Sequence, residues 1–223
     1  MSISVKSILA NLDSEQIKAV KTLDGPLYIL AGAGAGKTRT ITHRIAYAVK
    51  SNYWSVNSIL ATTFTVKAAL EMKDRLEKLE VSGVTVNTFH GVALEILKTN
   101  WQIITSAPFP ELMDNRLSFL ESICKSNSYN LSNIQIMAIS DEISWMKTSL
   151  VPVEQYKESL SWNNHEALDF INTEEFLYIF DCYETIKSQN NRIDFEDILL
   201  IMAHGIERYP QLDNKVRGRY RHF

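Results

Sequence analysis

The sequence predicts an α/β fold, in which a parallel sheet is flanked by helices, together with an all-helical inserted subdomain. Two observations lead to this prediction. Across roughly the first hundred residues, short apolar segments alternate with helical ones, which is the order that produces parallel strands covered by helices. From Glu111 to about Gln189 the pattern is helical throughout. At 223 residues the chain can bury one sizeable core plus a smaller second one.

The elements of the front part follow from hydrophobic spacing. Apolar runs predict strands at 27–30, 59–64 and 84–88, and the segments between them predict helices at about 37–50 and 66–79. In the second helix the apolar residues recur every three or four positions, which predicts one buried stripe: Ala69, Met72, Leu76 and Leu79.

A change of pattern at Ser106–Pro110 marks a domain boundary, because two prolines interrupt the chain there. We therefore predict an incomplete α/β domain formed by 1–105 and 191–223, and a helical insert at 106–190. A polar turn at 190–192 leads to a further helix near Asp194, and the tail at 220–223 has the composition of a strand's beginning.

Composition bounds the function more than it reveals it. Hydrophobic residues make up 45% of the chain and charged residues 22%, and the net charge is −3, so no overall basic footprint indicates nucleic acid. A nucleic acid would have to bind in a local groove. No apolar run approaches the roughly 20 residues of a membrane helix, and the first residues lack a signal peptide's pattern, so we expect a cytoplasmic protein. Cys124 and Cys182 are expected to be reduced thiols.

The strongest chemical signal is the run Ala31-Gly32-Ala33-Gly34-Ala35-Gly36-Lys37-Thr38, placed between a predicted strand and a predicted helix. Small residues let backbone N–H groups wrap around a polyphosphate at a helix N-terminus. Lys37 would reach the β- and γ-phosphates of ATP, and the Thr38 hydroxyl would bind Mg²⁺. The strict phosphate-loop pattern has Gly where this chain has Ala31. The alternative is a small-residue turn followed by an incidental Lys-Thr.

The neighbouring segments resemble the UvrD/Rep/PcrA group of superfamily 1 DNA helicases. AxxGxGKT is the form that the phosphate loop takes in that family. Four further segments look like family motifs in the right order: the Q motif at 12–20, motif Ia at 63–75, motif Ib at 86–91, and the segment before the acidic motif at 193–200. The resemblance implies a RecA-like P-loop motor domain with a helical insert. It further implies ATP-dependent translocation along single-stranded DNA, 3′ to 5′, in repair or replication.

Two residues near the nucleotide have competing interpretations. The resemblance implies that Gln16 pairs with the adenine edge, whereas its spacing from Asp13 alone favours a helix capping box. Arg39 matches a family position close to the base, and the alternative is a solvated arginine in the first helical turn.

The ends of two strands carry the implied DNA contacts. By resemblance, Phe64 stacks on bases while Thr63 and Thr65 bind phosphates, and Thr88, Phe89 and His90 face the same strand. The alternatives are a core phenylalanine at 64 and a helix cap at Thr88. Val66 stands where the family usually has Asn, which puts one contact in doubt. These contacts do not separate DNA from RNA, because stacking and phosphate binding ignore the 2′-hydroxyl.

ATP hydrolysis needs a carboxylate pair, and none of the acidic residues offers a good one. Asp141 and Glu142 are predicted to be a surface pair on an amphipathic helix, and Glu174 and Glu175 to begin another helix. Asp194 and Asp197 are predicted to cap the helix that they start. In the family the Asp-Glu motif comes soon after 193–200, so we expect a chain cut short of it and inactive by itself. The missing strand would leave an unpaired sheet edge, consistent with a monomer or a weak dimer.

Two other functions fit parts of the sequence. A non-catalytic, nucleotide-gated nucleic-acid-binding module would need no carboxylate pair. The front of a helicase–nuclease subunit resembling AddA or RecB would share the motifs, although the helical insert is short for that group. A small-molecule kinase would leave the segment 63–75 unexplained.

Overall fold

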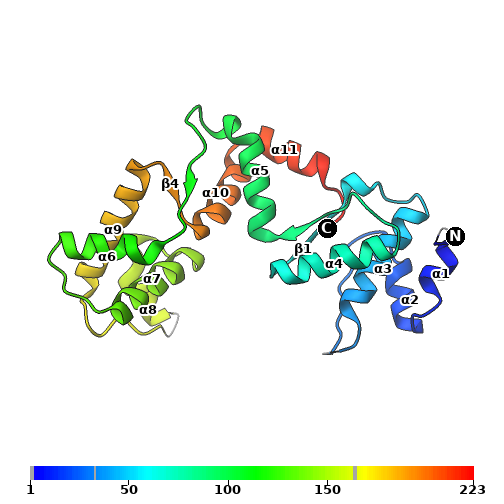
Figure 1. Cartoon of the computed structure of the whole chain (residues 1–223), viewed down its shortest axis with the longest axis horizontal. Helices are drawn as coiled ribbons and strands as arrows, with labels where there is room; N and C mark the ends of the chain where they lie inside the picture. The colour runs from blue at the N-terminus through cyan, green and yellow to red at the C-terminus, as the bar shows by residue number, and fades with distance from the viewer. Residues whose placement is uncertain (1–2, 33, 163–164) are drawn as a thin grey trace. The chain divides into compact units, whose positions relative to one another are not determined.

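The computed structural model describes residues 3–32, 34–162 and 165–223. The chain divides into two compact units, Met1–Thr99 with Ile206–Phe223 (unit 1) and Asn100–Gly205 (unit 2). Each unit has its own hydrophobic core. The divisions fall inside the helices α5 (Phe89–Ile104) and α10 (Phe195–Arg208), which Figure 1 shows in green and orange.

Unit 1 contains a small parallel sheet and the helices that cover it. The strands β1 (Leu60–Thr63) and β2 (Thr85–Thr88) pair in parallel from Leu60–Thr85 to Thr63–Thr88. The helices are α1 (Val5–Leu9), α2 (Ser14–Lys21), α3 (Lys37–Lys50), α4 (Val66–Lys78), the start of α5, and α11 (Pro210–Arg219). A short 3-10 helix, η1 (Val56–Ser58), precedes β1. Beyond α11, His222 forms a parallel bridge with Ile59, as the composition of the tail predicted.

The core of unit 1 forms where α3 packs against α1, α2 and α4. The stripe predicted for α4 is buried at Ala69, Met72 and Leu76, while Leu79 follows the helix and packs at the edge of the core. The sequence therefore predicted α3 and α4 to within one residue.

The strand predicted at 27–30 is wrong. This segment has no strand partner among the described residues, and Tyr28 and Leu30 are 86% and 85% exposed. A strand exists only when its backbone bonds to a neighbour, and an apolar run cannot supply that neighbour. Among the described residues of unit 1, β1 pairs with β2, and Ile59, directly before β1, forms the bridge with His222.

Unit 2 is mainly helical, as predicted. Its helices are α6 (Arg116–Ser126), α7 (Asn133–Thr148), α8 (Tyr156–Trp162), α9 (Thr173–Gln189) and the start of α10, with the 3-10 helix η2 (Val153–Gln155) before α8 (Figure 1). The core lies between α6, α7 and α9. It includes apolar residues that recur three or four positions apart along α7 and α9: Ile136, Ile139, Ile143, Met146, Phe176, Ile179 and Tyr183. Asn172 and Glu175 form a capping box, so α9 begins where its acidic pair indicated.

Two features of unit 2 differ from the prediction. A two-residue parallel pair joins β3 (Glu111–Leu112) to β4 (Arg192–Ile193), where helix and a polar turn were expected. Glu142 is buried and not on the surface, whereas its neighbour Asp141 is exposed, as predicted. Within the described residues, no helix combines the length and apolar character required to span a membrane.

Candidate nucleotide and nucleic-acid site

The glycine-rich loop leads into the N-terminus of α3. Gly36 is the N-cap of that helix and has a φ of +78°, a left-handed conformation that favours glycine. Among the described residues, no side chain caps the N–H groups in the first turn of α3. Such a helix end suits an anion such as a phosphate group. Ala33, which was assigned to the same loop, lies outside the described residues.

Lys37 is the first residue of α3, and its ammonium group lies over the loop. Its Nζ donates to the carbonyl oxygens of Ala31 at 2.8 Å and Gly32 at 2.7 Å. Thr38, the next residue, is half-buried. The loop thus combines backbone donors, a lysine ammonium and a hydroxyl within one turn of helix, which is the donor set that a magnesium–nucleotide complex requires.

Gln16 combines the cap that its spacing predicted with a contact to the loop. Its backbone N–H donates to Asp13 Oδ1 at 2.8 Å, and its Oε1 accepts from the Asp13 N–H at 3.3 Å, so the capping box is present. Its Nε2 also donates to the Ala35 carbonyl at 3.3 Å. Arg39 is not merely solvated, because its guanidinium donates to the Asn11 carbonyl at 2.7 Å.

A pair of aromatic rings lies at the carboxyl ends of β1 and β2. Phe64 follows β1 and is 93% exposed, and Phe89 follows β2 and is 48% exposed. Their ring centroids are 5.8 Å apart with an interplanar angle of 50°. The alternative of a core phenylalanine at position 64 is therefore wrong.

The threonines at these strand ends hold turns. Thr65 is the N-cap of α4 and accepts from the Ala68 N–H at 3.1 Å, and the Thr63 hydroxyl donates to the Thr65 carbonyl at 2.9 Å. Thr88 accepts from the Gly91 N–H at 3.1 Å, so it has the capping contact that was the alternative to a DNA contact. His90 is half-buried in the first turn of α5.

Sequence reasoning missed Asn87, which shapes this turn. Its Oδ1 accepts from the Thr88 N–H at 2.8 Å and lies 2.5 Å from where a Cβ on Gly91 would be placed. Glycine at 91 is the signal that could have revealed this close approach.

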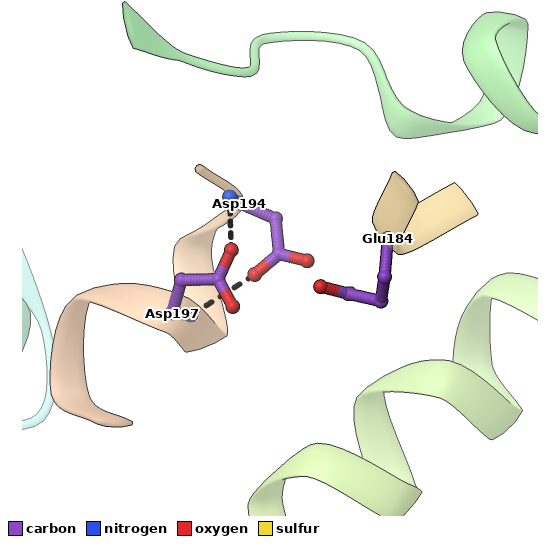
Figure 2. Close-up of side chains that lie close together, drawn as sticks. All are labelled: Glu184, Asp194 and Asp197. Carbon is purple, nitrogen blue, oxygen red and sulfur yellow. Dashed lines mark hydrogen bonds between the residues drawn. The ribbon is translucent and has the colours of Figure 1, made fainter. Parts of the chain in front are cut away.

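A separate cluster of carboxylates lies in unit 2. Figure 2 shows Glu184 of α9 pointing toward Asp194 and Asp197 at the start of α10. The two aspartates cap each other: each backbone N–H donates to the other carboxylate at 2.9 Å, which confirms the predicted capping role. Three converging carboxylates are also a donor set for a divalent cation.

Two lysine side chains occupy the position that a cation would take. Lys147 Nζ lies 2.6–2.9 Å from oxygens of all three carboxylates, and Lys187 Nζ lies 2.7–3.2 Å from them. Burial alone would raise the pKa of Asp194, but the two ammonium groups outweigh it and hold that pKa well below its usual range. Burial alone would lower the pKa of Lys147, and the carboxylates reverse that effect. This cluster is a buried ion network and not a metal centre.

Comparison with known proteins identifies the family. The model of the UvrD/REP helicase N-terminal domain matches residues 12–223. The chain belongs to this family. The family resemblance drawn from the motifs is thereby confirmed.

The relatives of this UvrD/REP-type chain include ATP-dependent DNA helicases of mycobacteria and staphylococci. The ATP-dependent DNA helicase UvrD2 of Mycobacterium bovis and that of Mycobacterium tuberculosis are each 32% identical to the whole chain, which covers 33% of each relative. The ATP-dependent DNA helicase PcrA of Staphylococcus epidermidis is 33% identical over 93% of the chain and 28% of the relative. The chain thus spans about a third of the length of these curated relatives.

Proposed function

We propose that this chain is the ATP-binding N-terminal region of an ATP-dependent DNA helicase or translocase. In this proposal 1–105 and 191–223 belong to a RecA-like motor domain, and 106–190 form its helical insert. The family membership and the uncapped N-terminus of α3 support ATP binding. By family resemblance, we further propose 3′-to-5′ movement along single-stranded DNA during repair or replication.

ATP would bind at the glycine-rich loop with its phosphates on the α3 N-terminus. The backbone N–H groups of the loop and of the first turn of α3 would donate to phosphate oxygens. The Ala35 N–H now donates to the Gly32 carbonyl at 3.3 Å and would have to leave it. Ala33 is assigned to the same set by its place in the sequence. Lys37 would exchange its carbonyl partners at Ala31 and Gly32 for the β- and γ-phosphates. The Thr38 hydroxyl would hold Mg²⁺, which neutralises charge that develops during phosphoryl transfer. Gln16 and Arg39 would contact the adenine side.

Single-stranded DNA would follow the carboxyl ends of β1 and β2. Phe64 and Phe89 offer faces on which bases can stack. The Thr65 and Thr88 hydroxyls accept the N–H groups of their caps, so each keeps a proton for a phosphate oxygen. The Thr63 proton is already donated to the Thr65 carbonyl and would have to leave it. His90 follows Phe89 in the chain and would contact the backbone of the same DNA strand.

The observation that carries the nucleic-acid part of the proposal is the 93% exposure of Phe64. A phenylalanine that is fully buried on folding adds about 1.5–3 kcal/mol to the free energy of unfolding. Phe64 is exposed, so it adds almost none of this stabilisation. A large exposed aromatic beside a second aromatic at a strand end is better placed to bind a ligand than to stabilise the fold.

The test is the binding of a labelled oligothymidylate, measured by fluorescence anisotropy. Phe64→Ala should weaken binding by about tenfold, since base stacking contributes roughly 1–3 kcal/mol per base. Tyr28→Ala is the matched control, because Tyr28 is another exposed aromatic of unit 1, at 86%. Equal binding by wild type and Phe64→Ala would refute the proposed DNA contact. An oligouridylate competitor then measures how far RNA is also accepted.

Helicase activity itself is proposed for a longer protein that carries this region. Such a protein should hydrolyse ATP faster when single-stranded DNA is added, and Lys37→Ala should abolish that turnover. The 223-residue chain alone is proposed to bind ATP with little or no turnover. If the longer protein bound ATP and DNA without any hydrolysis, a nucleotide-gated binding module would replace the motor as the proposal.

A further inference from the structure

Gln16 is the side chain that links α2 to the glycine-rich loop. Its amide contacts two different backbone groups at once: Oε1 accepts from the Asp13 N–H, and Nε2 donates to the Ala35 carbonyl. Ala35 lies directly before Gly36, the N-cap of α3. The Gln16 amide therefore anchors the end of the loop, at Ala35, to the helix α2.

A second hydrogen bond joins α3 to the residues before α2. Arg39 of α3 donates to the carbonyl of Asn11, which lies just before α2. Two side chains thus connect the segment 11–16 with the loop and the start of α3. Gln16 of α2 bonds to the loop, and Arg39 of α3 bonds to the residue Asn11 before α2. Together they fix the distance between the segment 11–16 and the loop.

The space beside Gly36 shows how close this packing is. A Cβ added at Gly36 would lie 3.1 Å from Gln16 Nε2, which is tighter than ordinary van der Waals contact. The amide of Gln16 therefore lies against the backbone where the loop turns into the helix.

The same amide has capacity left for a ligand. Its NH₂ group has two protons and its oxygen two lone pairs, and the two contacts use one of each. A base edge could bind the remaining proton and lone pair while the link to Ala35 stays intact. Contact with a base and support of the loop are therefore separable roles of Gln16.

We infer that Gln16 is a positioning residue for the phosphate-binding loop and that it acts on that loop whether or not a base is bound. This inference rests on the proposed binding of ATP at the loop. A residue that contacts only the base affects only ligands that contain a base. A residue that holds the loop also affects the binding of a bare polyphosphate chain.

Magnesium tripolyphosphate is the probe that separates these roles, because it presents three phosphates and no base. Binding of MgATP and of magnesium tripolyphosphate to the chain is measured by isothermal titration calorimetry. Gln16→Met removes both hydrogen bonds of the side chain without adding charge. We expect it to weaken both ligands by about threefold to tenfold, since a neutral hydrogen bond contributes roughly 0.5–1.5 kcal/mol.

A second variant guards against loss of α2, because Gln16→Met also removes the Asp13 contact of the capping box. Gln16→Glu keeps an oxygen that accepts from Asp13 and removes only the donor to Ala35. The titration is repeated at about 0.5 M salt, which screens the added charge of the glutamate. The loss of affinity for both ligands should persist there. Glu15→Gln, an exposed change in the same turn, should leave both affinities unchanged.

The outcomes are distinct. If both ligands weaken in both Gln16 variants, the positioning role stands. If MgATP weakens while tripolyphosphate binds as to wild type, Gln16 contacts the base alone and the inference is overturned. If the Gln16 variants bind both ligands normally, the inference fails while ATP binding stands. If the wild type binds neither ligand, the proposed function fails and the inference fails with it.

Discussion

Glu142 is a carboxylate buried in unit 2, where it contacts the side chains of Tyr156 and His165. The Tyr156 hydroxyl donates to its Oε1 at 2.6 Å, and His165 Nε2 lies 2.7 Å from its Oε2. The His165 ring also stacks on Trp145, with centroids 3.7 Å apart. Burial, together with the bond to Glu142, raises the pKa of Tyr156 well above its usual range. The tyrosine therefore remains a neutral donor throughout the physiological range.

The adjacent residues Glu142 and Asp141 give a matched pair of substitutions. Glu142→Ala leaves buried polar partners unsatisfied, so the free energy of unfolding should fall by about 2 kcal/mol. Asp141→Ala, on the exposed side of the same helix, should change it by less than about 0.5 kcal/mol. Urea denaturation followed by circular dichroism measures both. Equal effects of the two substitutions would contradict the role assigned to Glu142.

At the scale of elements, the sequence predicted the features that depend on local spacing. The bounds of α3 and the buried stripe of α4 follow from apolar residues on one helical face, and the cap of α10 follows from two aspartates three residues apart. In the candidate site, the glycine-rich loop was predictable from its small residues and from the helix that follows it, α3. The exposed position of Phe64 agrees with the base stacking that the family resemblance implied.

The features that could not be predicted depend on partners distant in sequence. The burial of Glu142 requires residues 14 and 23 positions away. The pairing of β3 with β4 joins two-residue strands about 80 positions apart, and neither has a pattern of its own. The strand wrongly predicted at 27–30 has an apolar pattern, but among the described residues it has no strand with which to pair. The link from Gln16 to Ala35 is likewise non-local.

The start of α10 should be the most sensitive point of unit 2. The Asp194 side chain is only 2% exposed, and it accepts from both lysines and from the Tyr183 hydroxyl. Asp194→Asn leaves two buried ammonium groups undercompensated and should lower the free energy of unfolding by about 3 kcal/mol. Asp213→Asn, which breaks the surface pair with Arg217, should cost less than about 1 kcal/mol. A loss below 1 kcal/mol for Asp194→Asn would contradict a network that stabilises the unit.

The same network predicts how stability depends on pH. The pKa of Asp194 is lower in the folded than in the unfolded chain, so below the unfolded value of about 3.9 the unfolded chain binds more protons. The stabilisation is therefore complete above that pH and is lost as the pH falls toward the folded value. Urea midpoints measured from pH 6 to pH 2.5 should fall steeply for wild type and less steeply for Asp194→Asn. Parallel curves would contradict this assignment.

At the scale of the whole molecule, two separate cores imply two unfolding reactions. Calorimetry should show one transition for each unit, with Asp194→Asn lowering only that of unit 2. Saturating MgATP should raise the transition temperature of unit 1 only. At a ligand concentration a hundred times the dissociation constant, the free energy of unfolding of unit 1 should increase by about 2.7 kcal/mol. A single transition that responds to both changes would show that the units unfold together.

The ammonium groups of Lys147 and Lys187 have a practical consequence for any assay of this chain. Because the protein supplies its own counter-charges to the three carboxylates of unit 2, that cluster has nothing to gain from a divalent ion in the buffer. Chelators and magnesium salts should leave unit 2 unaltered. If magnesium binds at the glycine-rich loop as proposed, a magnesium titration of the intact chain should follow that loop without a background from this cluster.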